Sequence, residues 1–252
     1  MGMKWLPWDE LPEKMRTEPV RAYYDRLAAR RGQLVLKRAF DIAASMVLLT
    51  LLSPVLAVLA VMIRCDSKGP VMFRQARVTQ YGRVFRIYKF RTMVDHAERL
   101  GAQVTTKGDA RITRVGRLLR KTRLDELPQL INILLGDMSF VGTRPEVEKY
   151  VAHYSGAMWA TLLLPAGVTS DASLRYKDEA ELLSGAEDAD AVYVEQILPE
   201  KMRYNLDALQ PGQRLPDHAA YGRCAVCPVR AARILRYNPG AGDFISGPWV
   251  RL

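Results

Sequence analysis

Cysteine is scarce in this sequence of 252 residues, which contains only Cys65, Cys224 and Cys227. An odd, sparse set provides no disulfide framework and is typical of a reducing compartment. Cys224 and Cys227 form a C-x-x-C pair downstream of His218, but no second pair completes a set of zinc ligands. The sequence therefore favours cysteines without a special role, and a zinc or redox site in the tail is the lesser alternative.

Acidic residues are few between Arg64 and Arg123, where 16 Lys and Arg stand against 4 Asp and Glu. The net charge of the whole chain is +10, so this block carries all of the positive excess. Such a block suits a polyanion: a nucleic acid, an anionic lipid surface or a nucleoside diphosphate. With 49% hydrophobic and 25% charged residues, the chain has the composition of a folded protein with one substantial core.

Charge is absent from the 22 residues between Ile42 and Ile63. A helix of this length extends about 33 Å, which is enough to cross the hydrocarbon core of a bilayer. The run begins too late and is too long for a signal peptide, and it lacks the polar face of a buried soluble helix. We therefore expect this segment to lie in a membrane.

Both ends of the apolar segment are basic, with Lys37 and Arg38 before it and Arg64 after it. The positive-inside tendency favours the cytoplasm for both ends. Ser53-Pro54 interrupts the segment, and proline bends a helix because it removes one hydrogen bond, although the Ser53 hydroxyl can bond a freed carbonyl. A re-entrant helix satisfies both observations, and the residues alone favour it about equally with a kinked span.

The first 32 residues carry aromatic side chains among charged ones. Such residues are common at the headgroup level of a membrane, so the segment is predicted to form an interfacial helix or a poorly ordered lead-in. The aromatic side chains are Trp5, Trp8, Tyr23 and Tyr24.

Residues 69–93 predict a β-hairpin, because apolar residues alternate with basic ones around a turn at Gly82. A solvated sheet face is the plain interpretation of the basic side chains, although their charge is one-sided beside a membrane segment. We expect five of them on the polar side of the hairpin: Arg74, Arg83, Arg86, Lys89 and Arg91.

Residues 111–123 predict an amphipathic helix, with a basic face opposite apolar residues at helical spacing. Next to a membrane anchor, a basic amphipathic helix indicates binding to anionic lipid. DNA binding fits the charge equally well but leaves the anchor unexplained. The apolar residues are Ile112, Val115, Leu118 and Leu119.

Two adjacent acids, Asp125 and Glu126, follow the basic block and precede an apolar stripe that ends at Gly136. Asp125 can cap the predicted helix, and the helix dipole favours Glu126 in its first turn. That role needs only one acid. Adjacent helical residues point about 100° apart, so one carboxylate can attack a substrate while its neighbour holds a metal. Both interpretations stay open on the residues alone.

The region from Leu36 to Leu206 resembles the bacterial sugar transferases, which are monotopic phosphoglycosyl transferases acting on polyprenyl phosphate. Six motifs in order carry the resemblance. They are KRAFD, the Ser53-Pro54 break, GPVMFRQARV, YKFRTM, DARITRVGRLLRKTRLDELPQLINILLGDMSFVGTRPE, and YV followed by MRYNL.

The resemblance implies an α/β (α+β) fold: a small cytoplasmic catalytic domain with a re-entrant, Ser-Pro-broken membrane helix and amphipathic interfacial helices, on the cytoplasmic face of the inner membrane. We expect a lead-in over residues 1–36, the membrane helix over 37–64, the catalytic domain over 65–206 and an atypical tail over 207–252. The residues assigned to the membrane segment are Lys37, Arg38, Asp41, Ser53 and Pro54.

The resemblance also implies a reaction: a sugar 1-phosphate passes from a nucleoside diphosphate sugar, expected to be a UDP-sugar, to undecaprenyl phosphate, and a nucleoside monophosphate is released. This step initiates a surface glycan such as an exopolysaccharide, O-antigen, capsule or glycoprotein glycan. Asp125 is the implied nucleophile, Glu126 its partner, and the two hold Mg²⁺. The implied substrate-binding residues are Lys89, Arg91, Arg144 and, more weakly, Asp137.

The implied partners are the two substrates and anionic membrane lipid, without nucleic acid; a homodimer stays open. A rival hypothesis is a membrane-anchored scaffold that is catalytically inactive and uses its basic face to bind lipid or a partner. A membrane-tethered nucleic-acid binder would explain the charge but leave the acidic pair and Ser53-Pro54 without a role.

The sequence departs from the family pattern in three places. Thr143 replaces a proline before Arg144, so the backbone there is less stiff. The loop PAGVTSDAS, Pro165 to Ser173, replaces a PGITG element that we expect to contact the donor nucleotide or sugar. The tail after Leu206 is rich in Pro and Gly where the family has a hydrophobic, basic helix.

Overall fold

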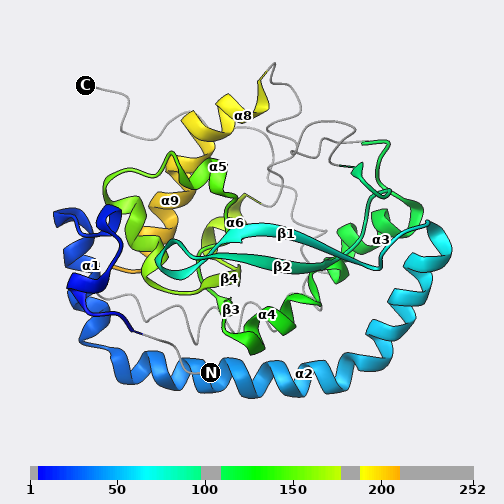
Figure 1. Cartoon of the computed structure of the whole chain (residues 1–252), viewed down its shortest axis with the longest axis horizontal. Coiled ribbons are helices and arrows are strands. Elements are labelled where there is room, and N and C mark those ends of the chain that lie inside the picture. The colour runs from blue at the N-terminus through cyan, green and yellow to red at the C-terminus, as the bar shows by residue number, and fades with distance from the viewer. Residues whose placement is uncertain (1–4, 98–108, 177–187, 211–252) are drawn as a thin grey trace, which may run out of the picture.

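A computed structural model describes residues 5–97, 109–176 and 188–210, and His218, Cys224 and Cys227 lie outside these ranges. The described chain mixes helices with two small sheets, as expected for an α+β fold. Figure 1 shows helix α2 along the base of the molecule, with the strands and shorter helices above it. The helices are α1 (Glu18–Ala28), α2 (Arg31–Asp66), α3 (Arg114–Thr122), α4 (Gln129–Leu135), α5 (Glu148–Val151), α6 (Asp171–Arg175), α8 (Ala189–Val192) and α9 (Leu198–Asp207).

Helix α2 continues through Pro54, and Figure 1 shows that it bends, so that its last part rises beside α3. Pro54 has no N–H to donate to the carbonyl of Thr50, four residues earlier. The Ser53 hydroxyl donates to that carbonyl instead, at 2.8 Å. The predicted compensation by Ser53 is confirmed, and the missing backbone hydrogen bond accounts for the bend.

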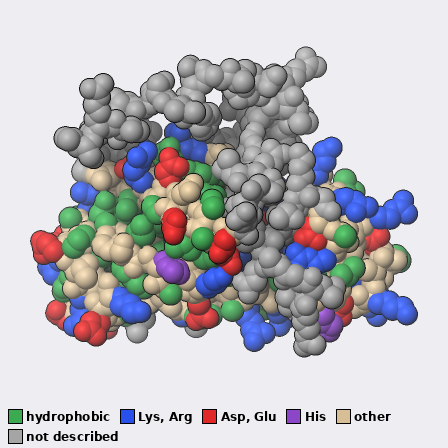
Figure 2. Space-filling view, turned by 90° about the horizontal axis from the view of Figure 1, so that it is seen from above, with side chains coloured by type: hydrophobic (Ala, Val, Ile, Leu, Met, Phe, Trp, Pro, Cys, Tyr) green, Lys and Arg blue, Asp and Glu red, His purple; other side chains and the backbone are tan. Residues whose placement is uncertain are grey.

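The outer face of α2 exposes a row of large apolar side chains. By length and composition this helix could cross a membrane. The face that looks away from α2 has a different character, since Figure 2 shows acidic, basic and apolar side chains interspersed on it. A large exposed apolar surface such as the outer face of α2 marks a membrane or protein contact. Its members are Val35, Leu36, Phe40, Met46, Val47, Leu48, Leu51, Val55, Val58 and Val61.

Strands β1 (Met72–Val78) and β2 (Val84–Phe90) pair antiparallel, which confirms the predicted hairpin. Its turn contains Gly82 with φ +77°. The predicted common polar face is wrong, because side chains alternate along a strand. Lys89 therefore shares the inner face of β2 with the buried Phe85 and Ile87, whereas Arg86 is exposed on the other face.

Strands β3 (Met138–Val141) and β4 (Ala166–Thr169) form a parallel pair. The two segments approach each other closely just beyond β3. A Cβ on Gly167 would lie 2.2 Å from the backbone nitrogen of Gly142. Larger residues at these positions would push the two segments apart. The glycines thus bring the loop after β3 and the loop after β4 to one edge of the sheet.

The N-terminal segment is part of the main core. Val20 and Leu27 of α1 are buried in the same cluster as Leu163 of the 3₁₀ segment η6 (Gly156–Leu163) and Met202 of α9. Trp5, Trp8, Tyr23 and Tyr24 all pack in or against this cluster. From Trp5 onward, the aromatic side chains of this segment thus pack on the domain.

Candidate active site

The acidic pair lies in a 3₁₀ turn, η5 (Leu124–Glu126), that precedes α4. The capping role predicted for Asp125 is wrong: α4 begins at Gln129 and has no side-chain cap. A cap at Asp125 would bond N–H groups two and three residues later. Pro128, at the third position, has no N–H to donate. Helix capping therefore does not explain the presence of Asp125.

Asp125 is 9% exposed, and its Oδ1 atom is buried without a hydrogen-bond partner in the part of the chain that the structure describes. Burial raises the pKa of Asp125, and the neighbouring Glu126 raises it further against the opposing charges of Lys89 and Arg123. Buried polar atoms are normally hydrogen-bonded. An unbonded carboxylate oxygen in a charged site indicates a functional group.

Glu126 has the opposite environment. Lys89 of β2 donates to its Oε1 at 3.1 Å, Arg144 bonds the same oxygen, and Arg123 lies 3.9 Å from it. Burial acts to raise the pKa of Glu126, but Arg144 and Lys89 outweigh burial and hold this pKa well below its usual range. Two neighbouring acids thus differ: Glu126 is clamped by cations, and Asp125 carries an unbonded oxygen.

Arg144 reaches Glu126 from the loop after β3. Its guanidinium also donates to the carbonyl of Val168 at 3.2 Å, which ties this loop to β4. Burial lowers the pKa of Arg144, but Glu126 raises it more, so the side chain stays charged. The structure therefore brings together four of the six predicted site residues: Asp125, Glu126, Lys89 and Arg144.

A buried ion pair that the sequence did not reveal supports the Arg144 loop. Lys201 of α9 donates to Glu146 at 3.3 Å and to the Tyr193 hydroxyl at 2.8 Å, and Tyr193 donates to Glu146 at 2.7 Å. Glu146 follows Arg144 by two residues, so this network fixes the end of the loop. Glu146 stands in the GTRPE motif and Lys201 directly precedes MRYNL, but nothing in their spacing paired them.

Arg91 is buried, but its contacts lie at the end of α2 rather than at the acidic pair. Its guanidinium donates to the carbonyl of Ser67 at 2.7 Å and to that of Lys68 at 2.8 Å. These bonds join β2 to the segment that follows the membrane helix. The structure thus gives Arg91 a role in holding the fold.

Asp137 lies at the other end of the hairpin. It pairs with Arg83 at 2.9 Å. Arg83 precedes Lys89 by six residues, which is roughly 20 Å along a strand. The structure does not bring Asp137 to the acidic pair and favours the structural alternative for it.

The first part of α2 is held by polar contacts to α4 and β3. Arg38 is buried and donates to the carbonyl of Ile133 at 2.6 Å, which satisfies the end of α4. Asp41 is 2% exposed and accepts hydrogen bonds from Ser139 at 2.8 Å and from Lys37 at 3.3 Å. These residues of the KRAFD motif thus pack against the rest of the domain.

The last part of α2 is held by the same domain. Leu59 and Ile63 are buried in a cluster with Phe90 of β2 and Leu119 of α3. Asp66, at the end of α2, accepts a hydrogen bond from the backbone N–H of residue 115 at 3.0 Å. Both ends of the apolar helix therefore pack on one domain.

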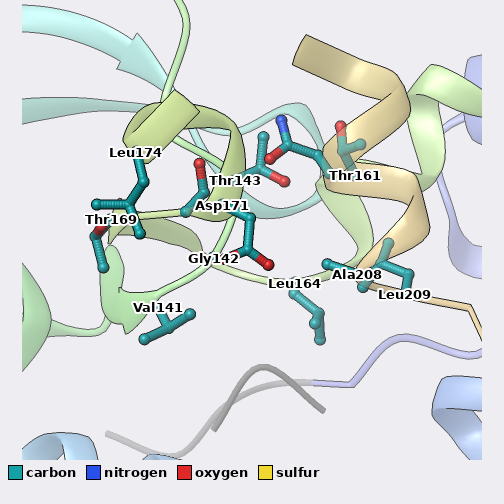
Figure 3. A pocket seen from close by; sticks show the side chains of 12 residues that line it. Val141, Gly142, Thr143, Thr161, Leu164, Thr169, Asp171, Leu174, Ala208 and Leu209 are labelled. Carbon is teal, nitrogen blue, oxygen red and sulfur yellow. The ribbon is translucent and has the colours of Figure 1, made fainter. Parts of the chain in front are cut away.

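A pocket lies between α9 and the loops that follow β3 and β4; its lining includes Thr143 but not Arg144 or the acidic pair. It encloses about 590 Å³ of empty space, its open mouth included. Figure 3 shows Thr169 and Leu174 on one side and Ala208 and Leu209 across from them. Thr143 also lines it, so the departures from the family pattern at Thr143 and in PAGVTSDAS meet here.

The protein is a small mixed helix-and-sheet domain that is held on a bent apolar helix and carries a buried Asp-Glu pair. This combination of features defines its class. Residues 32–202 match the family model described as bacterial sugar transferase. The match covers more than half of the chain, which therefore belongs to the bacterial sugar transferase family. The resemblance carried by the motifs is confirmed.

Three relatives illustrate the similarity. A UDP-N-acetylgalactosamine-undecaprenyl-phosphate N-acetylgalactosaminephosphotransferase of Aeromonas hydrophila is 50% identical over 119 residues, 47% of this chain and 28% of the relative. An exopolysaccharide production protein PSS of Rhizobium leguminosarum bv. phaseoli is 51% identical over 112 residues, 44% of this chain and 56% of the relative. A UDP-glucose:undecaprenyl-phosphate glucose-1-phosphate transferase of Escherichia coli (strain K12) is 39% identical over 181 residues, 69% of this chain and 38% of the relative. Each alignment covers less than two thirds of the relative's own length.

Proposed function

We propose that this chain is a phosphoglycosyl transferase that moves a sugar 1-phosphate from a UDP-sugar to undecaprenyl phosphate, releases a nucleoside monophosphate and so initiates a surface glycan. The observation that carries the proposal is the buried Asp125, with its unbonded oxygen, beside the cation-clamped Glu126. The names of two of the relatives, which act on UDP-sugars and undecaprenyl phosphate, support the substrate classes.

The reaction proceeds in two displacements at one phosphorus. In the first, a carboxylate oxygen of Asp125 bonds the β-phosphorus of the donor, and the bond from that phosphorus to the bridging oxygen breaks, so the nucleoside monophosphate leaves. In the second, an oxygen of undecaprenyl phosphate bonds the same phosphorus, and the bond to Asp125 breaks. The carboxylate is restored, as in ping-pong covalent catalysis.

The cations of the site act on the phosphate oxygens. Lys89 and Arg144 are held at the acidic pair by Glu126, which keeps two positive charges beside Asp125. Charge-assisted hydrogen bonds from these side chains would bind the transferring phosphoryl group and offset its repulsion from the nucleophile. Glu126 thereby orients the cations even where it does not contact substrate.

Mg²⁺ fits this donor set. Magnesium is usually bound by one or two carboxylates together with substrate phosphates. The unbonded Oδ1 of Asp125 and the adjacent carboxylate of Glu126 supply such ligands. Among the described residues there is no cluster of three or more His, Cys, Asp or Glu. When bound there, the ion would lower the charge of the diphosphate.

The helix α2 is proposed to be re-entrant, on the cytoplasmic face of the inner membrane. Its two ends are fastened to one domain by Arg38 and Asp41 at the start and by Leu59 and Ile63 near the end. The packing of both ends on the same domain supports a topology in which both ends lie on one side of the bilayer. The apolar outer face between them enters the hydrocarbon region.

Cysteine labelling tests this topology. In a background without native cysteines, single cysteines at Val35 and Lys68 are expected to react with an impermeant maleimide only when it reaches the cytoplasmic side. Labelling of the two positions from opposite sides would contradict the re-entrant arrangement.

Helix α3 is proposed to contact anionic headgroups beside the end of α2. Leu119 packs toward α2, while Leu118 is 49% exposed among basic side chains. An exposed apolar residue flanked by cations is typical of an interfacial helix. The exposed cations are Arg114, Arg117 and Lys121.

The pocket lined by Thr143 is proposed to hold the sugar or nucleotide part of the donor. Leu174→Trp would fill its mouth, and we expect the KM for the donor to rise about tenfold, since a fitted contact of about 1.4 kcal/mol corresponds to that factor. The KM for undecaprenyl phosphate should change little. Val84, which is 45% exposed like Leu174, provides the matched control. Equal effects of Val84→Trp and Leu174→Trp on the donor KM would argue against this use of the pocket.

The decisive assay for the function is release of nucleoside monophosphate. Purified protein is incubated with Mg²⁺, undecaprenyl phosphate and a panel of nucleoside diphosphate sugars, and release is expected with at least one donor. Failure with every donor would favour the inactive scaffold instead. The panel also identifies the sugar. It is needed because the relatives' names include both glucose and N-acetylgalactosamine.

A further inference from the structure

Glu146 lies near the end of the Arg144 loop (residues 142–147) and is a buried acid that the proposed displacements do not use. It is 6% exposed, and its partners Lys201 and Tyr193 are 5% and 3% exposed. Replacing a buried ion pair by apolar residues of similar size is often neutral or stabilising, so such a pair is weak evidence for stability. The Glu146 cluster, made of Glu146, Tyr193 and Lys201, therefore needs an explanation other than the stability of the fold.

An unusual helical turn assembles the Glu146 cluster. Tyr193 and Lys201 are eight residues apart, and on a regular α-helix their side chains would point about 80° apart. Residues 193–197 instead form a π-turn, in which each residue turns less because the hydrogen bonds span five residues rather than four. Both side chains reach the same oxygen of Glu146, Tyr193 at 2.7 Å and Lys201 at 3.3 Å. Such turns are rare and are frequent at functional sites.

Strand β1 holds the same stretch of backbone from the other side. The N–H of Val78 donates to the carbonyl of Glu146 at 2.9 Å, and the guanidinium of Arg77 donates to the carbonyl of Pro145 at 3.0 Å. The two residues that follow Arg144 are thus fixed between β1 and the helical segment of Tyr193 and Lys201. The side chain of Arg144 therefore extends from a backbone whose position the Glu146 cluster helps to set.

We propose that Tyr193 and Lys201 are positioning residues for Arg144: by holding Glu146, they keep the guanidinium of Arg144 aimed at the transferring phosphoryl group. This inference rests on the proposed transferase function. Arg144 bonds Glu126 and donates to the carbonyl of Val168 at 3.2 Å, so a shift of its backbone changes where its other N–H groups point. A misplacement of about 1 Å in a site can cost about 10²-fold in rate.

The test compares Tyr193→Phe with Tyr150→Phe. The two tyrosine rings stack with their centroids 4.4 Å apart, and both side chains are buried, so each substitution removes one hydroxyl from the same region. The hydroxyl of Tyr150 donates to Asp190 at 2.6 Å rather than to Glu146. We expect Tyr193→Phe to lower kcat for nucleoside monophosphate release by about tenfold, less than the full effect of a 1 Å misplacement because Lys201 remains. Its donor KM should change less than about threefold, and Tyr150→Phe should keep kcat within about twofold of the wild type.

An effect that passes through Arg144 disappears once Arg144 is removed. In an Arg144→Met background, Tyr193→Phe should therefore change kcat less than about twofold, whereas a merely structural role would lower kcat by the same factor in both backgrounds. Lys201→Met, which removes the other donor to Glu146, should show the same dependence on Arg144; if it does not fold, Tyr193→Phe decides.

Three results would overturn the inference while leaving the function intact. They are a wild-type kcat in Tyr193→Phe, an equal loss of kcat in Tyr150→Phe, and an equal factor for Tyr193→Phe with and without Arg144. A wild type that releases no nucleotide from any donor would overturn both the inference and the proposed function.

Discussion

Asp125→Asn should abolish turnover while the protein still folds and associates with membranes. Asparagine has the same shape but no negative charge, so it cannot attack phosphorus. Loss of a nucleophile that forms a covalent intermediate costs about 10⁴–10⁶ in kcat. Stability should be unchanged or slightly higher, because the substitution removes a buried carboxylate whose Oδ1 has no partner in the described chain. Initial rates and thermal unfolding of the purified variant measure both effects.

Asp137→Asn is the matched control for this prediction. Asp137 is also partly buried, but it pairs with Arg83 at the far end of the hairpin. We expect this variant to lose some stability and to retain kcat within about tenfold, since its contacts do not reach the acidic pair. Turnover by Asp125→Asn near the wild-type rate would remove Asp125 as the nucleophile.

Arg144→Met should impair both activity and stability. The arginine is the partner that most strongly offsets the burial of Glu126, and its side chain is 29% exposed against 11% for the glutamate. Removing one member of a buried ion pair costs about 3–5 kcal/mol. Because Arg144 is partly exposed and Lys89 remains, we expect a loss of roughly 2–3 kcal/mol in the free energy of unfolding.

The effect of Arg144→Met on kcat should be at least about 10³-fold, as for other arginines that neutralise a transferring phosphoryl group. Combining it with Glu126→Gln should restore part of the stability, because no buried charge is then left unpaired, but none of the activity. Arg144→Lys should fall between, since lysine keeps the charge and loses the two-pronged geometry. Equal stability of Arg144→Met and the wild type would show that the clamp on Glu126 contributes little.

Local patterns in the sequence predicted the hairpin and the long helix. Alternation around Gly82 and a charge-free run broken at Ser53-Pro54 are signals within one segment, and they depend on strand and helix periods that neighbours in sequence fix. The face of Lys89 was predicted wrongly because five basic residues in one hairpin suggested a shared polar side. The two-residue period of β2 instead places Lys89 beside Phe85 and Ile87.

The site itself could be predicted only in part. The adjacent acids and Arg144 stand in motifs, but the pairing of Arg144 with Glu126 depends on where the fold places the loop after β3 relative to η5. The helix cap at Asp125 failed for a local reason, the missing N–H of Pro128, which the sequence contained. Nothing in the sequence paired Lys201 with Glu146, because their contact depends on how α9 packs against the end of the Arg144 loop.

Intact-mass measurement of the covalent intermediate tests the central claim most directly. Wild-type protein is incubated with Mg²⁺ and a donor that it accepts, without undecaprenyl phosphate, and is compared with Asp125→Asn. The wild type should gain the mass of one sugar phosphate, located on the peptide containing Asp125, and should lose it when undecaprenyl phosphate is added. An unmodified wild type that nevertheless turns over with both substrates present, or the same adduct on Asp125→Asn, would contradict covalent catalysis by Asp125.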